Sequence, residues 1–399
     1  MTPMLPPRLK PIVEAEYPRF SAGEIARRRA AIERLMADAG CEHLVFVGAN
    51  RFGSAVGWLT QWPVTQEAVG VLTPGRRDAL YVHYYNHLPL ARRLASEADV
   101  RWGGASAIGN AVAELTARGA RSDREAGRVA VIGPILADQH AALADAFGKI
   151  VSLNKGYANL RRIKSAEELD WMRIGAWLSD LGMAALRDGV QPGMTEREVW
   201  NTIERGYVGH GGSHVIHYVG MTTMADPQVA VPAQWASSRR VANGDAVVAE
   251  ITAQFWDYPG QILRTFAVGS EPTQLYRDLH DTADAAFDAM AAVIRDGARC
   301  ADVVAASGLI EQRGFTTIDD ILHGYGGGYL SPILSSSSRT DGRHPIPDEP
   351  LEAGMTVVIQ PNVVTKDRRA GVQTGEMVLV TKSGYERMHQ LPGGFWRIC

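Results

Sequence analysis

The alternation of apolar and polar residues along this chain changes character near residue 160. Up to about residue 155, short apolar runs such as 43–48 and 68–72 alternate with segments of helical periodicity such as 21–39. Short apolar runs bounded by turn residues indicate buried strands, whereas apolar residues spaced three and four apart indicate amphipathic helices. Strands that alternate with helices predict an α/β domain over residues 1–155.

Residues 156–399 show a different order, in which helical sequence is followed by β-rich sequence, twice. Capping boxes formed by Ser165 with Glu168 and by Thr195 with Glu198 begin the first two helices. An Arg-Asp-Gly triplet at 187–189 recurs at 295–297, and an Arg-Gly pair begins 18 residues after the start of each. This repeat predicts a pseudo-symmetric α+β domain whose cleft lies between its halves.

The most strongly patterned stretch, residues 241–269, predicts a β-hairpin. Its apolar and β-branched residues indicate two strands, and the sequence Asp-Tyr-Pro-Gly at 257–260 predicts the turn between them. Glu250 falls in the middle of the first strand among apolar neighbours. Because burial raises the pKa of a carboxyl group, Glu250 is a candidate general base or nucleophile near neutral pH. The structural alternative is an ion pair between Glu250 and Arg264 across the hairpin.

Composition excludes several classes of partner. The 399 residues are 46% hydrophobic and 21% charged, with a net charge of −3, so no attraction to nucleic acid or to an anionic membrane is expected. The sequence has no apolar run long enough to span a bilayer, and its Pro-rich first 20 residues lack the apolar region of a signal peptide. Three cysteines at positions 41, 300 and 399 share no metal-binding spacing. We therefore expect a cytoplasmic protein without nucleic-acid or membrane partners.

The hairpin also carries a family resemblance. A Gly-Asp pair at 244–245, an acidic residue at 250, a polar residue at 261 and Arg-Thr-Phe at 264–266 resemble the core of the pita-bread family. That family includes methionine aminopeptidase, prolidase, aminopeptidase P and creatinase. The resemblance covers residues 155–395 well and the preceding region in outline. It implies an α+β pita-bread domain at 156–399, preceded by a smaller creatinase-type α/β domain at 1–155.

The resemblance breaks at the positions that bind metal in this family. Metal-dependent members hold two divalent cations with two Asp, one His and two Glu residues. The corresponding positions in this sequence are Glu250, Gln261, Gly327, Gln360 and Gly375. One carboxylate, two amides and two glycines offer too little charge and no imidazole for such a pair of cations. We therefore predict that the site holds no metal and no other cofactor.

Creatinase is the family's precedent for catalysis without a metal. The position of its catalytic His corresponds to Ala233 here, and those of its acidic partners to Leu263 and Gln360, so its mechanism does not transfer residue by residue. The residues that persist resemble metal-free relatives such as ectoine hydrolase: Glu250, Tyr258, Pro259, Arg264 and Thr265.

Candidate site residues follow from the resemblance together with side-chain chemistry. His323 opens a glycine-rich run at 323–328, where a neutral imidazole could bind substrate or transfer a proton. His210, His214 and His217 suggest a metal cluster at first sight, but Gly211-Gly212 interrupts a helix there, so we predict only His217 as a site residue. The predicted catalytic residues are Glu250, His323, Glu376 and His217. The predicted substrate-binding residues are Gln261, Arg264, Gln360, Tyr258 and Tyr325, and none is assigned to a metal.

The function predicted from these residues is metal-independent hydrolysis of a carbon–nitrogen bond in a small polar substrate. The predicted substrate is an amidine, a guanidino compound or a cyclic amide, and Glu250 would act as the base or the nucleophile. Two alternatives stay open: an Xaa-Pro metallopeptidase with atypical ligands, and a catalytically inactive binding protein of the same fold. Members of this family usually form dimers, and aromatic residues of the kind enriched at interfaces cluster between residues 58 and 87. We therefore predict a homodimer in which the N-terminal domain contributes to the partner's site.

Overall fold

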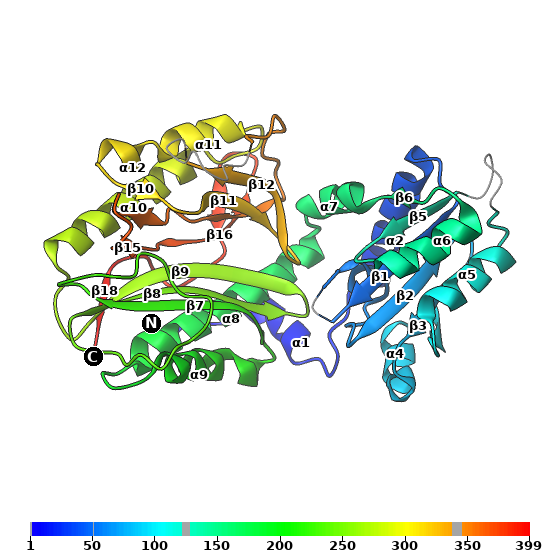
Figure 1. Ribbon diagram of the computed structural model, residues 1–399, viewed down its shortest axis with the longest axis horizontal. Coiled ribbons are helices and arrows are strands. Elements are labelled where there is room, and N and C mark those ends of the chain that lie inside the picture. The colour runs from blue at the N-terminus through cyan, green and yellow to red at the C-terminus, as the bar shows by residue number, and fades with distance from the viewer. Residues whose placement is uncertain (1, 51, 122–127, 337–344) are drawn as a thin grey trace. The chain divides into compact units, whose positions relative to one another are not determined.

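A computed structural model describes residues 2–50, 52–121, 128–336 and 345–399. Their contacts divide the chain into two compact units (Figure 1). The N-terminal unit is Ala15–Arg161, and the C-terminal unit combines Met1–Glu14 with Arg162–Cys399. Residues 2–14 therefore pack with the C-terminal unit, and the domain limits predicted from the sequence, 1–155 and 156–399, stay a prediction.

The N-terminal unit is a six-stranded mixed sheet with helices packed against it. In sheet order its strands are β4 (Ala98–Trp102), β3 (Asp78–Val82), β2 (Glu67–Leu72), β1 (His43–Ala49), β5 (Val129–Ile132) and β6 (Val151–Ser152). Its helices are α2 (Ala22–Asp38), α3 (Ala55–Thr60), α4 (Leu88–Leu94), α5 (Ala107–Ala117), α6 (Ala137–Phe147) and α7 (Asn154–Arg162). Valines of β1, β2 and β5 pack with Leu115 and Leu143 in one apolar core, as the short apolar runs predict.

The C-terminal unit is built on a nine-stranded sheet. Its main path runs β12 (Tyr329–Ser335), β11 (Asp320–Tyr325), β13 (Thr356–Ile359), β16 (Gly375–Val380), β9 (Tyr258–Val268), β8 (Asp245–Phe255) and β7 (Ser213–Thr223). Beside this path β17 (Tyr385–Arg387) pairs with β16, and β18 (Trp396–Ile398) pairs with β9. A second, three-stranded sheet contains β10 (Thr316–Thr317), β14 (Val363–Val364) and β15 (Gly371–Val372).

Helices precede each half of this sheet, as the sequence repeat predicts. The helices of the first half are α8 (Ala166–Gly189) and α9 (Glu196–Tyr207), and those of the second are α10 (Gln274–Val293), α11 (Cys300–Ser307) and α12 (Leu309–Gln312). A short α1 (Lys10–Val13) belongs to the same unit. Both predicted capping boxes are present at the starts of α8 and α9. The α+β arrangement predicted for residues 156–399 is therefore present.

The hairpin of β8 and β9 forms as predicted, but its turn lies earlier than 257–260. Trp256 and Asp257 have φ values of 47° and 67°, which are typical of a two-residue turn of the type I′ class. Tyr258 and Pro259 already pair with Phe255 and Gln254, and so belong to β9.

Close packing against α8 fixes which side of this hairpin is covered. A Cβ atom on Gly260 would lie 2.3 Å from the backbone of Ala176, and one on Gly175 would lie 2.3 Å from the Tyr258 carbonyl oxygen. Gly260 therefore faces α8, and residues of β9 in phase with it face α8 as well. Across the described ranges we find no helix with both the length and the apolar character of a membrane span.

Candidate functional site

The register of the central strands sorts the candidate residues onto two faces of the sheet. Glu250 lies opposite Leu263 on β9 and opposite Tyr218 on β7, whereas its neighbour Ile251 lies opposite Ile262. Because side chains alternate along a strand, Ile262 shares the α8-covered face with Gly260, and Glu250 points to the other face. We call this other face the Glu250 face.

Glu250 is held by side-chain amides. The Gln261 amide nitrogen donates to Glu250 Oε1 at 3.0 Å and also to Gln360 Oε1 at 3.0 Å. Gln373 donates from its amide nitrogen to Glu250 Oε2 at 3.2 Å. Burial, with a smaller contribution from the charge of Asp319, raises the pKa of Glu250 to about 7, although the Gln373 hydrogen bond lowers it. Glu250 can therefore gain or lose a proton near neutral pH, as the sequence predicts.

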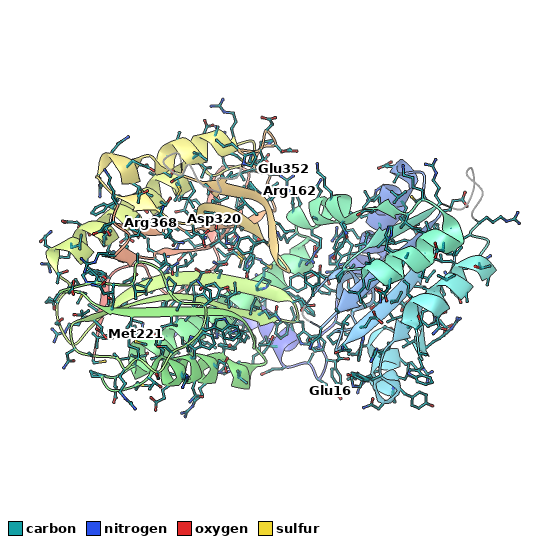
Figure 2. The ribbon with its side chains drawn as sticks, viewed as in Figure 1. Glu16, Arg162, Met221, Asp320, Glu352 and Arg368 are labelled. Atoms are coloured by element: carbon teal, nitrogen blue, oxygen red, sulfur yellow. The ribbon has the colours of Figure 1, made fainter. Side chains whose placement is uncertain are left out.

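A second buried carboxyl group, Asp320 at the start of β11, was not among the predicted site residues. Figure 2 shows it inside the C-terminal unit, and it is only 4% exposed. Burial first, then the charge and hydrogen bond of Asp319 and the charge of Glu250, raise the pKa of Asp320 to about 8. Asp320 Oδ2 has no hydrogen-bond partner among the described residues. The sequence signal was the Asp-Asp pair at 319–320, just before the glycine-rich run.

Aromatic rings border this polar cluster. The buried His323 ring stacks on Tyr329 with 3.9 Å between ring centroids and lies edge-on to Tyr325 at 5.2 Å. Burial lowers the pKa of His323 to about 4, against smaller opposing contributions that include Gln360. The imidazole is therefore neutral at pH 7, and Nδ1 lies 3.1 Å from the Gly324 carbonyl oxygen. Burial also raises the pKa of Tyr325 above its ordinary value.

The structure corrects the predicted grouping of Arg264 and Glu376 with Glu250. Arg264 lies opposite Ala249 on the α8-covered face, where Nη2 donates to Glu376 Oε2 at 2.8 Å and Nη1 donates to the Gly375 carbonyl oxygen. Arg387 also binds Glu376, with Nε donating to Oε1 at 2.5 Å. Burial would raise the pKa of Glu376, but the two arginines outweigh it and lower the pKa. The alternative of an ion pair between Glu250 and Arg264 is wrong, because the two side chains point to opposite faces.

Two further predicted residues lie on the helix side of the sheet. His217 lies opposite Ile251 on β8, and its Nε2 accepts a hydrogen bond of 2.7 Å from the Tyr207 hydroxyl of α9. Tyr258 donates its hydroxyl to Glu168 Oε1 of α8 at 3.0 Å. On the Glu250 face the place of His217 is taken by the adjacent Tyr218, whose pKa is raised by burial and by the charge of Glu250.

The donor set at the five metal-ligand positions does not fit a pair of divalent cations. Glu250, Gln261 and Gln360 converge through hydrogen bonds, but only one of them is a carboxylate. Gly375 has a φ of 154°, and a Cβ atom there would lie 2.2 Å from the Ile359 carbonyl oxygen, so this backbone cannot carry a side-chain ligand. Gly327 also has a positive φ, of 70°. Amide–carboxylate hydrogen bonds therefore stand where the resemblance would place metal–carboxylate bonds.

Comparison with known proteins agrees with the resemblance. The sequence model of metallopeptidase family M24 matches residues 170–382. An uncharacterized peptidase of Staphylococcus aureus is 28% identical over 232 residues, which are 57% of this chain and 62% of that protein. An uncharacterized hydrolase/peptidase of Sinorhizobium fredii is 29% identical over 173 residues, 42% of this chain and 43% of that protein. The match to these curated relatives thus spans less than two thirds of their length.

Solved structures show the same fold over nearly the whole chain. An Xaa-Pro dipeptidase from Bacillus anthracis superposes with a TM-score of 0.79 at 18% identity, covering 94% of this chain and all of that one. The dipeptidase PepE from Mycobacterium ulcerans gives a TM-score of 0.77 at 24% identity, covering 95% of this chain and 99% of that one. The predicted relationship to the pita-bread family is confirmed.

Proposed function

Because this chain belongs to metallopeptidase family M24, we propose that it hydrolyses a carbon–nitrogen bond without the pair of divalent cations used by metal-dependent members. The observation that carries this proposal is the network in which Gln261 links Glu250 to Gln360 at 3.0 Å each. A buried carboxyl group that keeps its proton near neutral pH can perform acid–base chemistry without a metal.

Glu250 and Asp320 supply the two proton-transfer groups. With a pKa of about 7, the ionised form of Glu250 accepts a proton from a water molecule as the water oxygen forms a bond to the substrate carbon. With a pKa of about 8, protonated Asp320 donates its proton to the leaving nitrogen as the carbon–nitrogen bond breaks. Loss of the proton from Glu250 and protonation of Asp320 from solvent then restore the starting state.

The remaining groups on the Glu250 face position the substrate. The amides of Gln261 and Gln373 hold the two oxygens of Glu250. The partly exposed ring of Tyr329, which stacks on the buried His323, offers flat apolar surface beside two acidic groups, which suits a planar, cationic amidine or guanidino group. The substrate class predicted from the sequence, a small polar carbon–nitrogen compound, is retained in this proposal.

A second candidate is hydrolysis of Xaa-Pro peptides. The solved structures that superpose include an Xaa-Pro dipeptidase and an X-Pro aminopeptidase from Thermotoga maritima. By their names these comparisons favour the peptidase alternative over hydrolysis of a small amidine. The donor set argues against the metal pair of such a peptidase, because Gln261, Gly327, Gln360 and Gly375 replace four of the five ligands.

One set of assays separates these candidates. Tag-free protein is tested with amidines, guanidino compounds, cyclic amides and Xaa-Pro dipeptides, with chelator or with added Mn²⁺ or Co²⁺, and Glu250→Gln is the matched control. The main proposal expects turnover of a small carbon–nitrogen compound that chelator does not reduce and that Glu250→Gln abolishes. Dipeptide turnover that requires added metal would establish the peptidase alternative, and saturable binding without turnover would establish a binding protein.

The proposal also keeps the oligomeric state and the cellular location that the sequence predicts. We propose a homodimer in which the N-terminal unit contributes to the partner's site, and a cytoplasmic location. Light scattering at micromolar concentration tests the dimer, and a monomer would contradict it.

A further inference from the structure

A cluster of metal-binding side chains lies on the helix side of the sheet, apart from the Glu250 face. Glu204 of α9 and His214 and His217 of β7 each offer one ligand atom, and these three atoms lie within 4.8 Å of one another. Glu204 Oε1 and His214 Nδ1 are already 3.4 Å apart. Nothing in the proposed hydrolysis uses these residues.

A β-bulge brings the two histidines to the same side. Residues three apart on a regular strand point to opposite faces. In β7, however, His214 pairs with Ala253 and Ile216 pairs with the next residue of β8, Thr252, so Val215 is an extra residue. Such a bulge re-aims the side chains that flank it, and the two histidine rings lie edge to face with centroids 4.4 Å apart. The bulge therefore compensates for the three-residue spacing, which would separate the two histidines on a regular strand.

The surroundings of His217 resemble those of an imidazole ligand. Its Nδ1 lies 2.5 Å from the Ile216 carbonyl oxygen, which fixes the proton on Nδ1 and leaves Nε2 with its lone pair. The Tyr207 hydroxyl donates to this lone pair at 2.7 Å. His214 and Glu204 are 29% and 42% exposed, so an ion can enter from solvent.

We propose that Glu204, His214 and His217 bind one Zn²⁺ or a similar divalent transition-metal ion, with water completing the coordination. Two imidazoles and one carboxylate are typical zinc ligands, and three protein ligands plus water give a four-coordinate site. Binding requires small movements of the side chains and release of the Tyr207 hydroxyl from His217 Nε2. Because β7 is an edge strand of the nine-stranded sheet, the bound ion would cross-link this edge strand to α9.

The test titrates tag-free, chelator-treated protein with Zn²⁺ against a chromophoric chelator, and with Co²⁺ by visible absorption. We expect one equivalent per chain, a higher melting temperature with Zn²⁺, and the absorption bands of four-coordinate Co²⁺. His214→Ala and Glu204→Gln should weaken binding by more than about 100-fold, because loss of a ligand should exceed the 10–100-fold effect of losing an outer-sphere partner.

Matched variants locate the ion. His210→Ala removes a histidine that packs on Trp177, outside the cluster, and should bind Zn²⁺ like the parent. Tyr207→Phe removes the competing hydroxyl and should bind at least as tightly. No specific binding by the parent, or full binding by His214→Ala, would overturn the proposal. Loss of the ion in Glu250→Gln with retention in His214→Ala would place the ion on the Glu250 face and overturn it too.

Discussion

Buried carboxyl groups have different partners on the two faces of the sheet around β8, β9 and β16. On the helix side, Glu376 accepts hydrogen bonds from Arg264 and Arg387, and Asp180 is paired with His389 at 2.9 Å. On the Glu250 face, two carboxyl groups have pKa values raised to about 7 and about 8. Acceptor atoms there lack hydrogen-bond partners among the described residues: Gln261 Oε1, Gln373 Oε1 and Asp320 Oδ2. In the proposed function, the paired groups of the helix side stabilise the fold, whereas the Glu250 face exchanges protons and binds a polar ligand.

The largest expected change in stability comes from removing the buried ion pair between Glu376 and Arg264 on the helix side of the sheet. Glu376→Gln leaves the buried Arg264 guanidinium without its counter-charge and should lower the free energy of unfolding by about 3–5 kcal/mol, measured by urea denaturation. The matched control is Glu386→Gln, because Glu386 is 49% exposed and pairs with Arg173 at the surface. That change should cost about 0–1 kcal/mol. Equal losses of unfolding free energy in Glu376→Gln and Glu386→Gln would contradict the stabilising role of the buried ion pair on the helix side.

A pH series probes the Glu250 face. Because the pKa of Glu250 is raised to about 7 in the folded protein, the folded state binds more protons than the unfolded state between about pH 4.5 and pH 7. This contribution to stability is present at low pH and is lost as pH rises through 7, by about 3 kcal/mol in total. Glu250→Gln removes it, so the variant should gain stability relative to the parent from pH 5 to pH 8. Parallel pH profiles would contradict the raised pKa.

Gly375 tests why a metal ligand is excluded. Gly375→Ala forces a Cβ atom toward the Ile359 carbonyl oxygen and should lower the free energy of unfolding by about 2–3 kcal/mol. Gly384→Ala is the control, because a Cβ atom there meets nothing within 4 Å. If Gly375→Ala left the free energy of unfolding unchanged, the backbone would tolerate a side chain at this position. The only argument against a metal ligand there would then be that the sequence has a glycine.

Local signals in the sequence predicted much of the fold. Ser165 and Thr195 lie at helix starts because a capping box involves residues only three apart. Glu250, Gln261 and Gln360 converge as the resemblance implies. The sequence predicts the turn too late because Pro259-Gly260 is typical of a turn, although Pro259 lies in β9 and Gly260 makes room for α8.

The parts of the site that sequence reasoning missed depend on contacts between distant residues. Arg264 pairs with Glu376, 112 positions away, rather than with Glu250 in the same hairpin. Which face Arg264 occupies follows from the register of β8 with β9, and the sequence pattern did not fix that register. Asp320 joins the site from β11, and the bulge at Val215 has no signature in residue type.

The most direct test of the account is the protonation state of Glu250 itself. Infrared difference spectra between the parent and Glu250→Gln isolate its carboxyl band, which is then followed from pH 5 to pH 9 with chelator and with excess Mn²⁺. We predict a protonated carboxyl band that is lost with a midpoint near pH 7 and that Mn²⁺ leaves unchanged. A carboxylate ionised throughout this range would contradict the raised pKa of Glu250, and a band shifted by Mn²⁺ would show that Glu250 is a metal ligand. Either result would contradict the account.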